Sequence, residues 1–314
     1  MARFERAAVI GTGMMGPGIA LTLGLGGVQA TILSRSPETA AAGLAKARAQ
    51  LQLLADAGIV AAERATRASG LLDASTDFDT AVALADIVIE SAPENMAFKQ
   101  DLFARLDALA KPEAVLASNT SGLSITEVAA RCARPERVLT THFWNPPHLM
   151  PLVEIVLGER SDPAVGASVK ALLAECGKKA VVVKRDTPGQ LGNRLQMALV
   201  REAAHIVEAG IADAEDVDEV VRSGFGLRLP VYGVFEHADI VGLDMVTAIA
   251  EYVSSDLYSE RRAPQIMRDK VAAGELGAKS GRGFHDWSRK DAAAVKERRD
   301  RFVLDFLQRR QAGG

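Results

Sequence analysis

The sequence is poor in the residues that mark disulfide-bonded, metal-binding and nucleic-acid-binding proteins. Its two cysteines, Cys132 and Cys176, form no CxxC pair and are too few for a disulfide framework, so we expect buried thiols in a cytoplasmic protein. The five histidines form no HxH or HExxH pair, which disfavours a metal-dependent mechanism. The formal net charge of −3 lacks the basic excess that a nucleic-acid partner usually requires.

The sequence also lacks an apolar run that fits a membrane helix or a signal peptide. Residues 7–34 carry no charge, but they are interrupted by Pro17 and by a series of glycines, namely Gly11, Gly13, Gly16, Gly18, Gly24, Gly26 and Gly27. So many glycines are better explained by a turn and a tightly packed helix than by a membrane span. No basic segment with a following small-residue cleavage site precedes the run. We therefore expect no membrane partner.

The chain length and the apolar pattern predict two domains of different classes. A chain of 314 residues with 48% hydrophobic and 25% charged residues is typical of a globular protein with two domains. Short apolar runs alternate with helical stretches up to Asp186, and this alternation is the βαβ pattern of a parallel sheet. Strands are expected at 7–10, 30–33, 86–90, 114–117, 138–142, 152–157 and 180–184. We predict a Rossmann-type α/β domain with a mainly parallel sheet over residues 1–186, followed by an all-α domain over 187–314.

A glycine-rich turn joins the first predicted strand to a helix at residues 14–27. The turn reads Gly11-Thr12-Gly13-Met14-Met15-Gly16, which is the pattern GxGxxG. In this pattern the first glycine permits the tight turn, the second lets the backbone approach a pyrophosphate, and the third packs the helix on the strand. The free N–H groups at the helix N-terminus then face the phosphates. These residues predict a dinucleotide-binding site.

The end of the second predicted strand departs from the usual NAD pattern. An Asp or Glu is expected there to bind the ribose 2′-hydroxyl of NAD, but this chain has Ser34-Arg35-Ser36. A hydroxyl followed by a guanidinium suits the 2′-phosphate of NADP, because Arg binds phosphate bidentately. The alternative is a solvent-facing Arg35 with NAD bound through the remaining contacts. The sequence leaves both interpretations open.

Three later segments carry groups suited to acid/base chemistry. His142 ends one predicted strand and Glu154 lies in the next, so a hairpin would set the imidazole against the carboxylate. Oxidation of an alcohol by hydride loss requires a base for the hydroxyl proton, and histidine serves this role near neutral pH. A carboxylate on the other ring nitrogen would orient the ring. Ser121 and Asn193 are candidates for hydrogen bonds to the reacting oxygen.

These segments resemble the 3-hydroxyacyl-CoA dehydrogenase family over residues 8–287. The matching motifs are GTGMMGPGIA, DIVIESAPEN, SNTSGLSIT, HFWNPPHLMPLVE, DTPGQLGNRL and GAKSGRGFHDW. The resemblance implies that His142 is the catalytic acid/base with Glu154 as its partner, and that Ser121 and Asn193 contact the substrate oxygen. It further implies cofactor contacts from Glu94, Lys99, Asn145 and Lys279. A helical second domain that forms a homodimer and closes over the substrate is also implied.

The segment in which family members that use acyl-CoA bind the CoA 3′-phosphate is altered in this chain. Residues 44–60 carry Gln50 and Ala57 where those relatives offer Ser and Lys, although Lys46, Arg48 and Arg64 remain nearby. Loss of charge-assisted contacts worth roughly 1.5–3 kcal/mol each weakens the acyl-CoA interpretation. The alternative within the family is a true (S)-3-hydroxyacyl-CoA dehydrogenase.

Other residues resemble the branch of the family that acts on free carboxylates, which includes the gulonate 3-dehydrogenases and the pyridine-carboxylate 5-dehydrogenases. The His-x-x-Asn-Pro-Pro form is typical of that branch, and Arg228 stands where gulonate-type members have an arginine for the substrate carboxylate. Trp144 and His148 are further candidates for substrate contacts. We therefore expect an NAD- or NADP-dependent dehydrogenase of a small hydroxy carboxylate. A non-catalytic, crystallin-like nucleotide-binding protein is disfavoured, because the catalytic set is complete.

The last part of the sequence predicts one more helix. Residues from Ser288 onward are highly charged, with an apolar stripe of Val295, Phe302, Val303 and Phe306. We expect this stripe to pack in the core or in a dimer interface rather than on a membrane.

Overall fold

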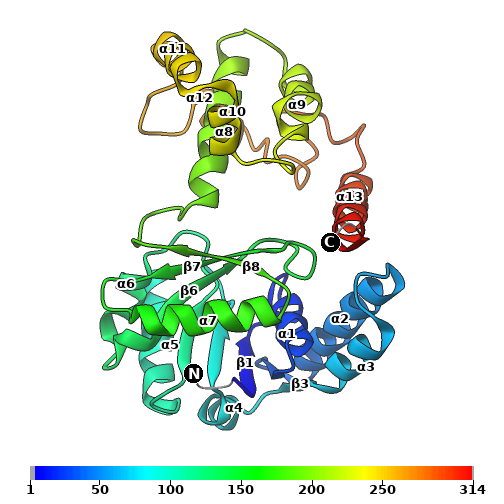
Figure 1. The fold of residues 1–314 in the computed structure, drawn as a ribbon, viewed down its shortest axis with the longest axis vertical. Helices are drawn as coiled ribbons and strands as arrows, with labels where there is room; N and C mark the ends of the chain where they lie inside the picture. Colours follow the sequence, from blue (N-terminus) through cyan, green and yellow to red (C-terminus); the bar gives the residue numbers. More distant parts are fainter. Residues whose placement is uncertain (1–3, 313–314) are drawn as a thin grey trace. The chain divides into compact units, whose positions relative to one another are not determined.

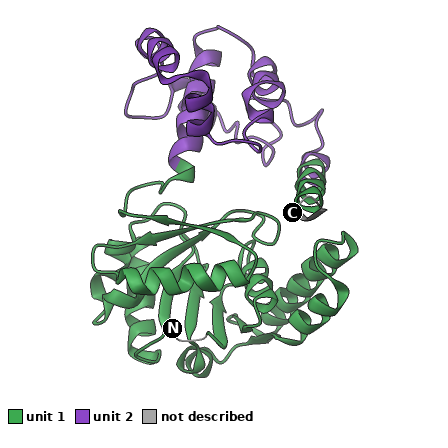
Figure 2. Cartoon of the chain, viewed as in Figure 1, with its two compact units in different colours: residues 1–193, 298–314 green, residues 194–297 purple. Residues whose placement is uncertain are grey.

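The computed structural model describes residues 4–312 and divides the chain into two compact units. Figure 2 shows one unit of residues 1–193 and 298–314 and another of residues 194–297. The first unit extends to Asn193, slightly beyond the expected boundary at Asp186, and the end of the chain also belongs to it. The reason for the later break is that the backbone N–H groups of Leu191 and Gly192 donate to Glu154 of the first unit. Within residues 4–312, no helix is both long enough and apolar enough to cross a bilayer.

The first unit is built on an eight-stranded sheet (Figure 1). Its strands are β1 (Arg6–Ile10), β2 (Gln29–Leu33), β3 (Leu72–Ser75), β4 (Ile87–Glu90), β5 (Val115–Ser118), β6 (Val138–Phe143), β7 (Leu152–Leu157) and β8 (Lys179–Val183). The spatial order is β3-β2-β1-β4-β5-β6-β7-β8, with only the β6–β7 pair antiparallel among the strand pairs of the described residues. The prediction of a Rossmann-type, mainly parallel sheet is confirmed.

Helices cover both faces of this sheet. They are α1 (Gly16–Leu25), α2 (Pro37–Asp56), α3 (Ala62–Gly70), α4 (Phe78–Leu84), α5 (Met96–Leu109), α6 (Ile125–Val128) and α7 (Pro163–Glu175), with short 3₁₀ turns η1 (Ala129–Arg131) and η2 (Pro135–Arg137). Because successive strand residues face opposite sides, Ile87 and Ile89 join the core under α1, α2, α3 and α7, whereas Val88 joins the core under α4, α5 and α6. The central strands are therefore buried on both faces, as strands of a covered parallel sheet must be.

The second unit is helical, as expected from the sequence after Asp186. Its elements are α8 (Gly192–Glu208), α9 (Ala214–Ser223), η3 (Phe225–Leu227), α10 (Val234–Val241), α11 (Leu243–Val253) and α12 (Gln265–Ala272). The loop before the last helix is fixed to α9, because His285 bonds both Glu215 and Asp218 at 3.0 and 2.9 Å.

The last helix, α13 (Ala292–Ala312), differs in detail from its predicted stripe. Val303 and Leu304 pack against the core of the first unit, while Phe302 is 61% exposed. The side chain of Gln308 also donates to the carbonyl oxygen of Ala57 at the end of α2. The packing face of α13 therefore includes Val303 of the predicted stripe but leaves Phe302 exposed.

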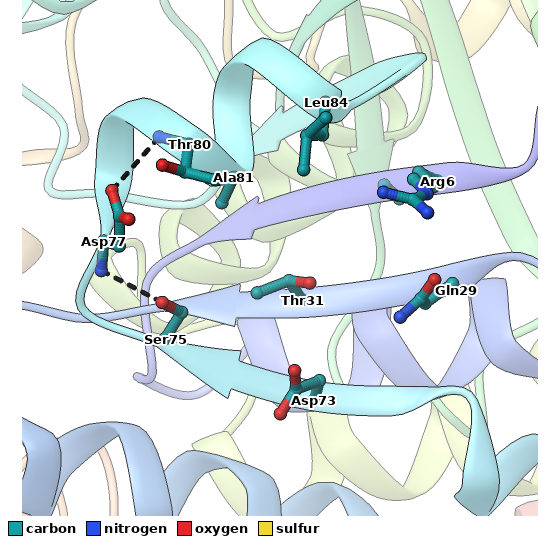
Figure 3. A pocket seen from close by; sticks show the side chains of 10 residues that line it. Arg6, Gln29, Thr31, Asp73, Ser75, Asp77, Thr80, Ala81 and Leu84 are labelled. Carbon is teal, nitrogen blue, oxygen red and sulfur yellow. Dashed lines mark hydrogen bonds between the residues drawn. The ribbon is translucent and has the colours of Figure 1, made fainter.

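A small pocket lies along the strands beneath α4 (Figure 3). It has a volume of about 220 Å³ and is lined by residues of β1, β2, β3 and α4. Asp77 caps α4 by accepting from the N–H of Thr80, and its own N–H donates to the hydroxyl of Ser75. This pocket contains none of the predicted site residues, so the candidate site is sought elsewhere in the first unit.

Candidate active site and cofactor site

The glycine turn after β1 has the geometry that a dinucleotide requires. Gly11 has a φ of 114°, a conformation that favours glycine, and a Cβ there would lie 2.6 Å from the carbonyl oxygen of Ser91. A Cβ at Gly16 would lie 1.8 Å from the carbonyl oxygen of Gly11, so α1 can approach the turn only through a glycine. An added Cβ at Gly13, in contrast, meets no atom within 4 Å. The open side of Gly13 is the place where a pyrophosphate can contact the backbone.

A cavity of about 1040 Å³ opens at this turn, beyond the carboxyl ends of β1, β2, β4 and β5. It lies at the point where the strand order reverses between β1 and β4, which is where open α/β sheets bind their ligands. The predicted residues that line it are Gly11, Gly13, Met14, Met15, Ser34, Arg35, Glu94 and Ser121. Its volume, its open glycine and the N-terminus of α1 together fit a dinucleotide.

In the Ser34-Arg35-Ser36 segment, the two serines form local hydrogen bonds and Arg35 lines the cavity. The Ser34 hydroxyl lies 2.6 Å from that of Thr39, and Ser36 caps α2 by accepting from the N–H of Thr39. Arg35 is exposed and lines the cavity at the end of β2. The Arg35 guanidinium therefore lies where the ribose 2′-substituent is expected. The acidic residue that usually ends this strand in NAD-binding domains is absent.

His142 and Glu154 face each other across the β6–β7 hairpin. The two residues are directly paired in the antiparallel register, and His142 Nδ1 lies 2.9 Å from Glu154 Oε2. Both side chains are buried, with 7% and 1% exposure. The structure thus brings together the imidazole and the carboxylate that the sequence placed on neighbouring strands. A carboxylate at Nδ1 selects the tautomer in which Nε2 is free to accept a proton.

The Glu154 carboxylate is surrounded by hydrogen-bond donors. Oε1 accepts from the N–H groups of Leu191 and Gly192 at 2.9 and 3.0 Å, and Oε2 accepts from the indole N–H of Trp144 at 3.1 Å. Burial on its own would raise the pKa of Glu154, but the hydrogen bonds from His142, these backbone groups and Trp144 lower it to about 2. Glu154 is therefore an ionised, fixed partner for His142 at neutral pH.

The turn after β5 is held by Glu94. Its carboxylate accepts from the hydroxyl of Thr120 at 2.9 Å and from the N–H of Ser121 at 2.7 Å. The Asn193 amide donates to the carbonyl oxygen of Ser121 at 2.8 Å. These bonds use the backbone of Ser121, so they fix the turn without occupying its hydroxyl. The structure therefore brings Ser121, Asn193 and Glu94 together around this turn.

Two positioning residues in this region were not expected. Asn119 accepts from the N–H of Phe143 at 2.8 Å and so ties the turn to the end of β6. Glu90 is fully buried and bonds Lys99 Nζ and the hydroxyl of Ser118, both at 2.6 Å. Lys99 is 1% exposed and also pairs with Glu94 at 3.4 Å, so it lies behind the cavity wall. This pair forms because β4 and α5 place Glu90 and Lys99 next to each other.

Among the described residues, none of the remaining candidates forms a hydrogen bond with His142. His148 is half-buried beside α1, and burial together with Lys178 lowers its pKa to about 4. Its Nδ1 has no hydrogen-bond partner among the described residues. Asn145 is exposed at the start of the same loop. Arg228 and Lys279 belong to the second unit, Arg228 directly after η3 and Lys279 in the turn after α12, so their roles stay predictions.

The donor set of the site contains no metal centre. Within residues 4–312, no group of three His, Cys, Asp or Glu side chains is arranged to hold an ion.

Comparison with known proteins identifies the family. Residues 6–187 match the family described as 3-hydroxyacyl-CoA dehydrogenase, NAD binding domain, and residues 189–287 match its C-terminal domain. The chain is 35% identical over 300 residues, covering 95% of each chain, to 5-formyl-3-hydroxy-2-methylpyridine 4-carboxylate 5-dehydrogenase of Mesorhizobium japonicum. It is 39% identical over 287 residues, covering 91% of this chain and 98% of the other, to a probable 3-hydroxybutyryl-CoA dehydrogenase of Bacillus subtilis.

A solved structure supports the same assignment. It is a 5-formyl-3-hydroxy-2-methylpyridine 4-carboxylic acid 5-dehydrogenase, described as an NAD⁺-dependent dismutase, and it matches with a TM-score of 0.87 and 34% identity over 98% of this chain and 99% of the other. The chain therefore belongs to the 3-hydroxyacyl-CoA dehydrogenase family and is an NAD-dependent dehydrogenase that acts on a hydroxyl group.

Proposed function

We propose that the enzyme transfers a hydride between NAD and a small hydroxy carboxylate, with His142 as the acid/base and Glu154 as its orienting partner. The observation that carries this proposal is the 2.9 Å contact between His142 Nδ1 and a Glu154 carboxylate fixed by further donors on both oxygens. NAD supplies the hydride acceptor for oxidation. Nε2 of His142 takes the hydroxyl proton as the carbonyl forms, and the buried Glu154 stabilises the imidazolium.

Ser121 and Asn193 are proposed to bind the reacting oxygen. Both lie on segments that are fixed to one another, since Asn193 donates to the Ser121 carbonyl and Glu94 holds the Ser121 N–H. A hydroxyl and an amide on two segments that are hydrogen-bonded to each other can orient the substrate oxygen toward His142. Arg228 of the second unit is proposed to bind the substrate carboxylate, because a guanidinium pairs bidentately with that group.

A free acid is favoured over an acyl-CoA because basic side chains near residues 44–60 already have backbone partners in place of a CoA phosphate. Lys46 donates to the carbonyl oxygen of Gly13 at 3.2 Å, and the Arg64 guanidinium donates to the carbonyl oxygen of Leu25 at 2.9 Å. The carbonyl of Ala57, at a position where CoA-using relatives offer Lys, receives Gln308 of α13. Two of the three cations near this segment are thus engaged with backbone groups, and a helix contacts its end.

The second candidate is a 3-hydroxyacyl-CoA dehydrogenase. It is supported by the relative from Bacillus subtilis, whose name specifies 3-hydroxybutyryl-CoA and which is 39% identical to this chain. Arg48 is exposed on α2 and remains available for a phosphate.

The deciding experiment measures reduction of acetoacetyl-CoA with NADH, beside oxidation of a panel of free hydroxy acids and pyridine-ring alcohols with NAD. We expect turnover with a free acid and at most a trace with the thioester. Rapid acetoacetyl-CoA reduction would instead establish the second candidate. The same panel run on H142N separates enzyme-catalysed from background turnover, and R228A should raise KM for the acid while leaving NAD affinity unchanged.

We further propose that a second copy of the chain covers the apolar surface of the second unit. Large apolar side chains of this unit are exposed, including Val231, Phe235, Ile240 and Tyr252 at 82%, 84%, 75% and 85%. Exposed apolar area on this scale marks a contact surface. Sedimentation of the protein should give a dimer, and F235D should shift it to monomer. The enzyme is expected in the cytoplasm, because both cysteines are unpaired and buried.

A further inference from the structure

Trp144 contacts both members of the acid/base pair. Its indole N–H donates to Glu154 Oε2 at 3.1 Å, and His142 Nδ1 lies 2.9 Å from that same oxygen. The rings of Trp144 and His142 are 5.7 Å apart and inclined at 48°. The indole also lies against Gly192, where a Cβ would come within 2.2 Å of Trp144 Cζ2. The ring is therefore confined between the imidazole and the backbone that binds the other carboxylate oxygen.

When one carboxylate oxygen accepts two hydrogen bonds, each of the two bonds is weaker than a single hydrogen bond to that oxygen would be. In general, the negative charge of a carboxylate favours the protonated form of an imidazole bonded to it, and a second donor on the same oxygen neutralises part of that charge. The indole N–H does not titrate near neutral pH, so its effect on the carboxylate is constant. Loss of this donor would leave Oε2 to His142 alone.

We propose that Trp144 is a positioning residue that shares Oε2 of Glu154 with His142, fixes the carboxylate, and weakens its hold on the His142 proton. The inference rests on the proposed role of His142 as acid/base. In this proposal, Trp144 sets the pH range in which His142 is unprotonated. It does not contact the substrate.

Charged groups on the neighbouring elements have contacts of their own. From the α5 side, Glu94 pairs with Lys99 and accepts from Thr120 and Ser121. After β8, Asp186 accepts from the hydroxyl of Ser124 and the N–H of Thr126. Lys184 and Arg185 of that segment are exposed. Next to β6, Ser118 at the end of β5 and Asn119 directly after it are neutral. Besides His142, the side chain that donates to the Glu154 carboxylate among the described residues is that of Trp144.

The test compares W144F with W287F. W144F keeps an aromatic ring but removes the N–H, whereas W287F removes the other tryptophan, which lies in the second unit. The titration midpoint of the His142 imidazole is followed by NMR with labelled histidine, with H142N used for assignment. The acid limb of kcat/KM for alcohol oxidation is measured in parallel.

The expected result is a move of both midpoints to higher pH in W144F by roughly half to one pH unit, so that the rate below the limb falls about three- to tenfold. W287F should leave both unchanged. If the His142 midpoint in a folded W144F stays the same or moves to lower pH, the proposal is overturned. The indole then contributes only packing. Full activity in H142N would instead overturn the proposed function, whatever W144F does.

A second measurement covers the case in which W144F does not fold. In W287F the only tryptophan left is Trp144, so its emission reports on the contact directly. The emission should change with the same midpoint as the His142 imidazole, and the additional substitution H142N should abolish that change. Emission that stays constant across the His142 titration would overturn the proposal.

Discussion

The two halves of the sheet build their parts of the site in opposite ways. At β1 and β2 the site is made by missing side chains, since Gly11 and Gly16 permit close backbone contacts and Gly13 leaves an open face. At β6 and β7 it is made by side chains, because a buried carboxylate, Glu154, collects donors around an imidazole, His142. The cofactor half should therefore be damaged by added atoms, and the catalytic half by removed hydrogen-bonding groups.

The largest expected effect comes from removing the base in the catalytic half. H142N keeps a polar side chain but has no group that accepts the proton, so kcat/KM should fall about 10²- to 10⁴-fold. NADH affinity, measured by fluorescence titration, should stay the same, because the glycine turn and cavity walls are untouched. A parallel loss of NADH binding would show that the two halves are not independent.

The next effect concerns the pH dependence of stability through Glu154. Its pKa in the folded protein is about 2, against an ordinary value of 4.5, so its stabilising effect is complete above pH 4.5 and is lost as the pH falls toward 2. A shift of this size corresponds to about 3 kcal/mol, of which about 2 kcal/mol disappears between pH 5 and pH 3.

E154Q isolates this contribution, because a glutamine does not titrate. Urea unfolding of the wild type and E154Q at both pH values should show a stability difference that narrows by about 2 kcal/mol at pH 3. A difference that does not depend on pH would mean that Glu154 is not the strongly ionised group described here.

In the cofactor half, a matched pair of glycine substitutions separates fold from binding. A methyl group at Gly16 would meet the Gly11 carbonyl at 1.8 Å, so G16A should destabilise the protein by roughly 1–3 kcal/mol. G13A adds its methyl group where no protein atom lies within 4 Å, so it should leave Tm unchanged. It should still weaken NAD binding roughly tenfold, because the pyrophosphate approaches there. Equal effects of both variants on Tm would refute the distinction.

The sequence predicted those parts of the molecule whose signals are local. The run Leu152–Leu157 is strongly apolar and was placed correctly as a strand, and the GxGxxG turn was recognised from its spacing. The strand Leu72–Ser75 was missed, because its Asp and Ser give it no apolar run. The His142–Glu154 contact followed from a hairpin, which is also a local feature.

Contacts between distant segments could not be predicted in this way. Glu90 meets Ser118 only because β4 and β5 pair, and Glu154 meets Gly192 only because the chain returns after β8. The indole of Trp144 has a partner ten residues away, but the sequence does not reveal whether its N–H faces Glu154 or solvent. Register and side-chain direction decide these cases, and both depend on the assembled sheet.

The last expected effect tests whether Arg35 influences the choice between NAD and NADP in the cofactor half. Arg35 is exposed at the end of β2 and lines the cavity, so R35A should weaken NADPH binding roughly tenfold through loss of a charge-assisted contact, with little change for NADH. Arg105 is the matched control, because it lines the same cavity but is paired with Asp79 and stacked on Phe78. R105A should therefore affect NADH and NADPH alike. If R35A also changes both equally or neither, Arg35 faces solvent, and the cofactor half selects NAD through its backbone alone.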